Sequence, residues 1–254
     1  MKRLLLAVLL LVSWGCREAQ EPKPPAEPEP ILEVQPQPPP KPPPEPDVKP
    51  PEYRAKVSAL PEEVQKKMKG ISWRPGCPVP MADLVFIELR HWGYEDQLMD
   101  GELVVHKDVA GDIVEIFEEL FKARFPIEKI WLVDEYNGDD LESMRDNNTS
   151  AFNCRWKVPK PGVFSQHAFG TAIDINPLVN PYHSPKLILP KGGEKYTDRS
   201  IKAKGMVFKD DVVYRAFTSR GWAWGGDWKR KKDYQHFEKK RDRAGRLIRP
   251  NRKQ

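Results

Sequence analysis

SQHAFGTAID, residues 165–174, places a histidine and an aspartate seven residues apart, with a glycine between them. The second half of this stretch alternates in the manner of a strand, which predicts Asp174 on one face and the apolar Ile173 on the other. Because seven is an odd number, His167 and Asp174 would point to opposite faces of a straight strand. We therefore expect the chain to bend or bulge at Gly170, so that the two side chains converge.

A second acid and a second histidine follow about sixty residues later, at Asp233 and His236. They are three residues apart, so a helical turn or a tight loop would bring them together. Two histidines and one carboxylate are a frequent ligand set for catalytic zinc, and a spare carboxylate beside them can act as the base for an attacking water. The sequence predicts a zinc hydrolase in which His167, Asp174 and His236 bind one zinc ion and Asp233 is the base.

Other residues of the same types remain as alternatives. His183, in a predicted loop, is the reserve ligand, and Asp227 and Glu238 are the alternatives for the base. His91 and His106 belong to predicted strands, where a histidine is more often structural. Three tryptophans beside the glycine pair at 225–226 are expected to wall the cleft: Trp222, Trp224 and Trp228.

The N-terminus has the pattern of an export signal. Two basic residues precede the apolar run Leu4–Val12, which is too short for an ordinary membrane span. The following Ser13-Trp14-Gly15-Cys16 resembles a bacterial lipoprotein signal, although the bulky Trp14 departs from that pattern. We expect residues 1–16 to be a signal peptide with Cys16 as its lipidation site, and plain secretion is the alternative. Either way the mature protein is expected in the cell envelope, facing the periplasm or cell wall, with a lipid anchor at a membrane in the first case.

Residues 17–54 are predicted to form a disordered, proline-rich linker. Between residues 22 and 51 the chain carries fifteen of its 27 prolines, mixed with Glu, Lys and Gln. Such a segment has little to bury and favours extended polyproline II, which would reach about 90 Å at roughly 3.1 Å per residue. We interpret it as a spacer that holds residues 55–254, one folded domain, at a distance from the membrane.

The net charge of +5 is modest and concentrated late in the chain, from residue 229 onward. Basic tails of this kind can bind nucleic acid. For an exported protein, a solvated surface or attraction to anionic envelope polymers is the better interpretation. We therefore expect no nucleic-acid partner.

Periodicity predicts an α+β fold for the domain. Strands and helices mix without a regular βαβ rhythm or a glycine-rich nucleotide loop, which favours a mainly antiparallel sheet flanked by helices. Seven of the eight tryptophans lie in this domain, as expected if it has a substantial core. The predicted strands are residues 84–89, 101–106 and 129–134, and the predicted helices are residues 62–69 and 109–124.

Three cysteines occur in the chain: Cys16, Cys77 and Cys154. With Cys16 assigned to the signal, an even pair remains in an oxidising compartment. We therefore predict a disulfide between Cys77 and Cys154, with two buried free thiols as the alternative.

The motif Ser-x-His-x-x-Gly-x-Ala-x-Asp, followed by Asp-x-x-His-Phe, resembles the M15 zinc peptidases. This group includes VanY-type D-alanyl-D-alanine carboxypeptidases and L-alanyl-D-glutamate peptidases. The branch described as D-alanyl-D-alanine carboxypeptidase-like is similar at several further places: Ser143-Met144, residues 147–153, Asp174-Ile175-Asn176-Pro177 and residues 221–228.

The resemblance implies zinc at His167, Asp174 and His236, and hydrolysis of peptidoglycan stem peptides with Asp233 as the base. It also implies an arginine that holds the substrate, for which Arg145 and Arg155 both qualify, and a supporting role for Ser165. The expected activity is a D-alanyl-D-alanine carboxypeptidase. An L-Ala-D-Glu or cross-link endopeptidase, and a zinc-containing lipoprotein that binds cell wall without cutting it, are the alternatives.

Overall fold

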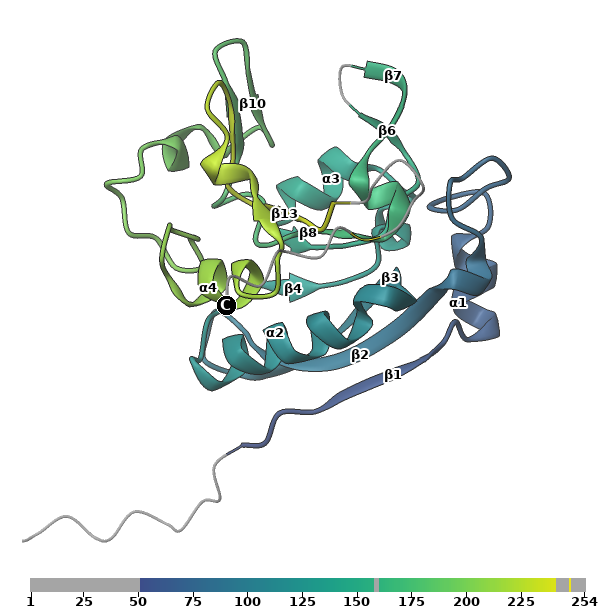
Figure 1. Cartoon of the computed structure of the whole chain (residues 1–254). Coiled ribbons are helices and arrows are strands. Elements are labelled where there is room, and N and C mark those ends of the chain that lie inside the picture. The colour runs from purple at the N-terminus through teal and green to yellow at the C-terminus, as the bar shows by residue number, and fades with distance from the viewer. Residues whose placement is uncertain (1–50, 158–159, 241–246, 248–254) are drawn as a thin grey trace, which may run out of the picture. The chain divides into compact units, whose positions relative to one another are not determined.

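The structure is a computed structural model, and it describes residues 51–157, 160–240 and 247. Its largest sheet joins β1 (Ala55–Ala59), β2 (Leu84–Trp92) and β3 (Leu98–His106) in that order, with antiparallel pairing throughout (Figure 1). The predicted strands at 84–89 and 101–106 are the first six residues of β2 and the last six of β3.

Helix α2 (Ala110–Lys122) covers one face of this sheet (Figure 1). Its Ile113, Ile116 and Leu120 are at most 1% exposed, at the spacing that puts them on one helical stripe. They join a core that includes Ile87 on β2 and Val105 on β3. The periodicity that predicted a helix at 109–124 thus also identifies its buried face.

The other face of the sheet is buried as well. Phe86 and Val104 alternate with the residues that face α2, and they pack in a second core with Met68 from α1 (Glu62–Met68). Cys77 and Cys154 lie at this second core and are joined by a disulfide across 77 residues of chain.

The remaining elements are short. The predicted α+β class with mainly antiparallel pairing is confirmed, but the strands form several small sheets instead of one. Strands β4 and β5 alone, among the described residues, pair in parallel. The other helices are α3 (Asp140–Arg145) and α4 (Val212–Thr218), and the other strands are β4 (Lys129–Ile130), β5 (Asn148–Thr149), β6 (Trp156–Lys157), β7 (Lys160–Phe164), β8 (Ala172–Asp174), β9 (Tyr182–Ser184), β10 (Leu187–Leu189), β11 (Ala223–Trp224), β12 (Lys232–Asp233) and β13 (His236–Glu238).

The strand predicted at 129–134 is shorter than expected. It stops at Ile130, because the next backbone N–H, that of Trp131, donates to the Asn148 side chain (2.8 Å) and not to a neighbouring strand. A 3-10 turn at Val133–Tyr136 follows. The Asn148 side chain thus ends the backbone pairing of β4 with β5. The apolar run in the sequence gives no sign of this interaction.

The predicted signal peptide, Cys16 and nearly all of the predicted linker lie outside the described residues. Within the described part of the chain, no helix has the length and apolar character needed to span a bilayer.

The disulfide generates a first prediction. A non-reduced digest of the purified chain should yield a linked peptide containing Cys77 and Cys154. Replacing both with Ser should lower the free energy of unfolding by roughly 3–5 kcal/mol, because the bond closes a long loop in the unfolded chain. Mass spectrometry and urea unfolding measure the two effects. Alkylation of both thiols without prior reduction would contradict the bond.

Candidate metal centre and cavity

The pairing of β8 with β13 builds the centre of the candidate site. In their antiparallel register Asp174 lies opposite His236, and Ile173 lies opposite Phe237. Opposed residues share one face of a sheet, and successive residues alternate between faces. Ile173 and Phe237 therefore enter the core, where both are fully buried. The same register places Asp174 and His236 side by side on the opposite face.

His167 reaches this pair from a 3-10 turn, Gln166–Phe169. The turn ends at Gly170, whose φ of +65° lies in the left-handed region that favours glycine. A Cβ at Gly170 would also lie 2.6 Å from the backbone nitrogen of His106, a contact that backbone cannot relieve. The bend expected at Gly170 is thus a tight turn that packs directly against the end of β3.

The three side chains converge on one point. His167 Nε2 lies 3.2 Å from an Asp174 carboxylate oxygen, and His236 Nδ1 lies 2.9 Å from the other. The two imidazole nitrogens are themselves 3.2 Å apart. All three donor atoms lie within 4.8 Å of one another, and all three residues are buried. Two imidazoles and one carboxylate fit a zinc ion that keeps a fourth position open.

Each histidine is oriented by a partner on its far side. His167 Nδ1 lies 2.6 Å from the carbonyl oxygen of Ala151, an acceptor, so Nδ1 carries the proton and Nε2 offers its lone pair to the site. His236 Nε2 lies 3.4 Å from a carboxylate oxygen of Glu238, which leaves Nδ1 for the site. Glu238, an alternative for the base in the sequence, therefore contacts the His236 nitrogen that faces away from the convergent group, and it also lines the cavity described below.

Asp233 borders the same group of residues. It lies on β12, and its Oδ1 atom is fully covered without a hydrogen-bond partner among the described residues. A Cβ on Gly225 would come within 2.6 Å of the Asp233 Cβ and carbonyl oxygen. Glycine at that position is what lets the acid lie so close to β11. A covered carboxylate oxygen without a partner has an accepting position left for a water.

The electrostatics of the group favour a bound cation. Burial opposes charge on Asp174, but the adjacent His167 and His236 outweigh it and hold the pKa of this carboxyl well below its usual range. Burial likewise opposes charge on His236, yet hydrogen bonds to Asp174 and Glu238 raise the pKa of its imidazole to about 10. The carboxylates thus create a negative potential at the buried nitrogens.

Asp233 behaves differently. Burial raises the pKa of its carboxyl to about 6, with His236 opposing the rise and the Asp174 carboxylate reinforcing it. A raised pKa brings this carboxyl closer to neutral pH, which is the direction that favours a general base.

The group opens into a cavity of about 430 Å³. The hairpins β6–β7 and β9–β10 extend on the same side of the domain, with β8 and β13 between them at the base (Figure 1). Both hairpins contribute lining residues: Lys157 from the first, and Tyr182, Leu187 and Leu189 from the second.

The two candidate arginines lie in different places relative to the cavity. Arg155 lines the cavity beside Ser165, whose backbone N–H donates to the Arg155 carbonyl (3.0 Å). Arg155 pairs with Asp140 at 2.8 Å, and its buried Nε has no acceptor among the described residues. Arg145 ends α3, pairs with Glu142 and does not line the cavity.

The other candidates lie away from the convergent group. His91 Nδ1 contacts the Trp92 carbonyl, His106 accepts from the Asp108 backbone, and His183 lies on the β9 hairpin. Asp227 accepts from the Tyr214 hydroxyl. The prediction that three tryptophans wall the cleft is wrong for two: Trp222 and Trp224 belong to the core, and Trp228 alone of the three lines the cavity. The indole N–H groups of Trp222 and Trp224 donate to the Asp112 carboxylate and to the Tyr234 carbonyl, respectively. A prediction that treats tryptophan as purely apolar does not anticipate these partners.

Sequence reasoning missed several cavity residues. The segment with His183 was predicted to be a loop and no strand was predicted at residues 187–189, because strands of three residues are too short to show alternation; Tyr182, Leu187 and Leu189 were therefore not identified. Lys231 was counted only as part of a basic run. The sequence does contain one indication of these cavity residues: an aromatic residue and a lysine, Trp228 and Lys231, lie just ahead of Asp233.

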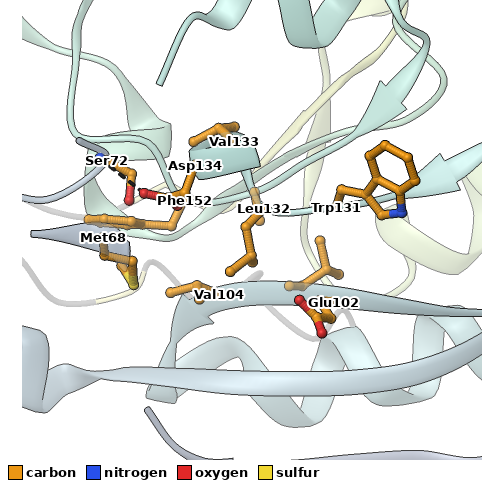
Figure 2. A pocket seen from close by; sticks show the side chains of 11 residues that line it. Met68, Ser72, Glu102, Val104, Trp131, Leu132, Val133, Asp134 and Phe152 are labelled. Atoms are coloured by element: carbon orange, nitrogen blue, oxygen red, sulfur yellow. Dashed lines mark hydrogen bonds between the residues drawn. The ribbon is translucent and has the colours of Figure 1, made fainter. Parts of the chain in front are cut away.

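A second cavity of about 10 Å³ lies between α1 and β3 (Figure 2). Asp134 accepts from the Ser72 backbone N–H (3.3 Å) there, and burial raises the pKa of this carboxyl. The Ser72 hydroxyl is buried without a partner among the described residues. The space is about that of one water molecule, so we interpret it as a hydration site inside the fold and not as a ligand pocket.

Comparison with known proteins agrees with the geometry. Residues 159–239 match the M15 peptidase family model described as D-alanyl-D-alanine carboxypeptidase, which confirms the resemblance drawn from the motifs. The matched segment contains the buried group His167, Asp174 and His236 as well as Asp233. No match was found among curated proteins or among solved structures.

Metal binding provides the second prediction. The purified chain should bind one zinc ion, and His167→Ala should abolish stoichiometric binding, because it removes one of three ligands. Glu238→Gln should keep the fold but weaken zinc about ten- to hundredfold, the usual effect of losing a partner that orients a ligand. His183→Ala is the matched control and should bind like the wild type. Competition with a chromogenic chelator measures each affinity; full zinc retention by His167→Ala would refute this ligand set.

Proposed function

We propose that this protein is a zinc-dependent peptidase that hydrolyses peptidoglycan stem peptides, with the D-alanyl-D-alanine bond as its target. One observation carries the proposal: a buried His-Asp-His group lies near the Asp233 carboxylate, whose Oδ1 has no hydrogen-bond partner among the described residues, in a cavity bordered by an arginine. The family match supports the same class of substrate.

His167, Asp174 and His236 hold the zinc in this proposal. A zinc ion bound there would supply a Lewis acid that polarises a peptide carbonyl and acidifies a water molecule. Asp233 takes the proton of the attacking water, for which its raised pKa suits it. It then returns this proton to the leaving amine, so that one carboxyl acts first as base and then as acid.

Arg155 binds the substrate carboxylate next to the scissile bond. Its guanidinium has five N–H donors, of which the Asp140 contact at 2.8 Å engages one, and its Nε is unpartnered among the described residues. A carboxylate can take two parallel hydrogen bonds from such a group, which fixes orientation as well as position. Asp140 keeps the guanidinium in place before substrate arrives.

Digestion of purified muropeptides tests the function. Pentapeptide muropeptides should lose a single C-terminal alanine, and mass spectrometry of the products identifies the bond. Asp233→Asn should retain zinc and fold but lose about two to four orders of magnitude in rate, because the amide cannot accept the proton. Asp227→Asn, an exposed acid outside the cavity, is the matched control.

Other products would redirect the proposal. Cleavage between L-alanine and D-glutamate, or of cross-linked dimers only, would assign an endopeptidase of the same family. Binding of the peptides with no cleavage by a zinc-loaded chain would favour the non-catalytic wall-binding alternative.

We also propose that the protein is exported and anchored by a lipid at Cys16. The disulfide supports a compartment outside the cytoplasm, where such bonds persist. Cys16→Ser should move the protein from the membrane fraction to the soluble fraction of the producing cells without changing its activity. A wild-type chain that is already soluble after fractionation would refute the anchor and leave plain secretion.

A further inference from the structure

Lys231 is a cavity-lining cation that forms no ion pair with any described residue. Its Nζ lies 4.7 Å from the Trp228 ring and 5.3 Å from the Tyr182 ring, and both of these rings line the same cavity. The faces of the two aromatic rings attract the ammonium and hold it in place. The lysine is thus positioned by aromatic rings and has its hydrogen-bonding capacity free.

The place of Lys231 relative to the metal group follows from Trp228. The Trp228 ring centroid lies 5.8 Å from that of the His236 ring. One aromatic residue thus neighbours both Lys231 and a proposed zinc ligand. A peptide that reaches the metal group would also come within reach of this ammonium.

The cations of the cavity come from two different parts of the chain. Lys157 lies in the β6–β7 hairpin, and Arg155 directly precedes this hairpin. Lys231 directly precedes β12, which pairs with β9 of the other hairpin. The two hairpins stand apart, with β13 and β8 between them (Figure 1). A ligand with one anionic group can be held by Arg155 alone, whereas a ligand with two can engage both.

We propose that Lys231 binds a second carboxylate of the substrate, so that the preferred substrate is a peptide with two free carboxylates, one at Arg155 and one at Lys231. This inference rests on the proposed function and names the charge pattern of its substrate. Charge complementarity supports it, because four carboxylates line the cavity, Asp140, Asp174, Asp233 and Glu238, and would repel a dianionic peptide that met no cations.

Variants of Lys229 and Lys231 distinguish carboxylate binding by Lys231 from an effect of general surface charge. Lys229 is exposed and does not line the cavity. Lys229→Met removes the same charge two residues away, and Lys231→Met removes it while keeping an unbranched stem to pack on the rings. Lys231→Arg keeps the charge.

The test uses two pentapeptides that end in D-alanyl-D-alanine and differ at one place. In one the α-carboxylate of the D-glutamyl residue is free, and in the other it is an amide. Calorimetry in the zinc-loaded Asp233→Asn background, in which turnover is suppressed, should show the free acid binding about fivefold more tightly, the scale of an ion pair with an exposed lysine. Lys231→Met should bring this ratio close to one with unchanged zinc content, whereas Lys231→Arg and Lys229→Met should preserve it.

The readout is the ratio of two dissociation constants, measured in a background in which turnover is suppressed. A Lys231→Met variant that keeps the wild-type ratio, or weakens both peptides equally, overturns the inference. Failure of wild type to bind either peptide overturns it as well. If Lys231→Met removes the difference in affinity but the wild-type protein cleaves neither peptide, the inference stands and the proposed peptidase function fails.

Discussion

The pairing of β8 with β13 is the constraint on which the rest of the site depends. One hydrogen-bonded register puts Ile173 and Phe237 into the core and, on the opposite face, brings Asp174 beside His236. A slip of one residue would exchange these faces, so that buried aromatic packing would be lost together with the convergent group. Stability and chemistry therefore rest on the same few backbone hydrogen bonds, and the Phe237–Phe217 stack at 4.1 Å helps to keep them in register.

Around that pair, charges of both signs are arranged at different depths. The carboxylates of Asp174 and Glu238 lie against the buried histidines, where they favour positive charge. The cations lie farther out, in the cavity walls. Such a gradient attracts a metal ion to the floor and an anionic ligand to the rim without either neutralising the other. Asp233 lies close to the floor without a hydrogen-bond partner on Oδ1 among the described residues, and burial raises the pKa of its carboxyl to about 6.

The long elements and the convergent residue types could be predicted from the sequence, whereas their arrangement could not. Nine-residue strands and a thirteen-residue helix repeat their apolar pattern often enough to be recognised, as β2, β3 and α2 show. Strands of two or three residues, such as β9, β12 and β13, have no measurable period. The choice between Arg145 and Arg155 depends on the chain path after α3, because Glu142 on the same helix retains the first of them at the surface. Trp222 and Trp224 were misplaced because their polar partners come from distant segments.

One short segment, Ser150–Arg155, touches nearly every working part of this domain. Ser150 exchanges two backbone hydrogen bonds with Asp174, and the Ala151 carbonyl orients His167. Cys154 carries the disulfide, and Arg155 follows it directly. The segment thus connects the floor of the site to Arg155 through a few consecutive residues. Directed evolution of this domain would accordingly find new specificities more readily in the β9–β10 hairpin, which bears none of the three proposed zinc ligands, than in Ser150–Arg155.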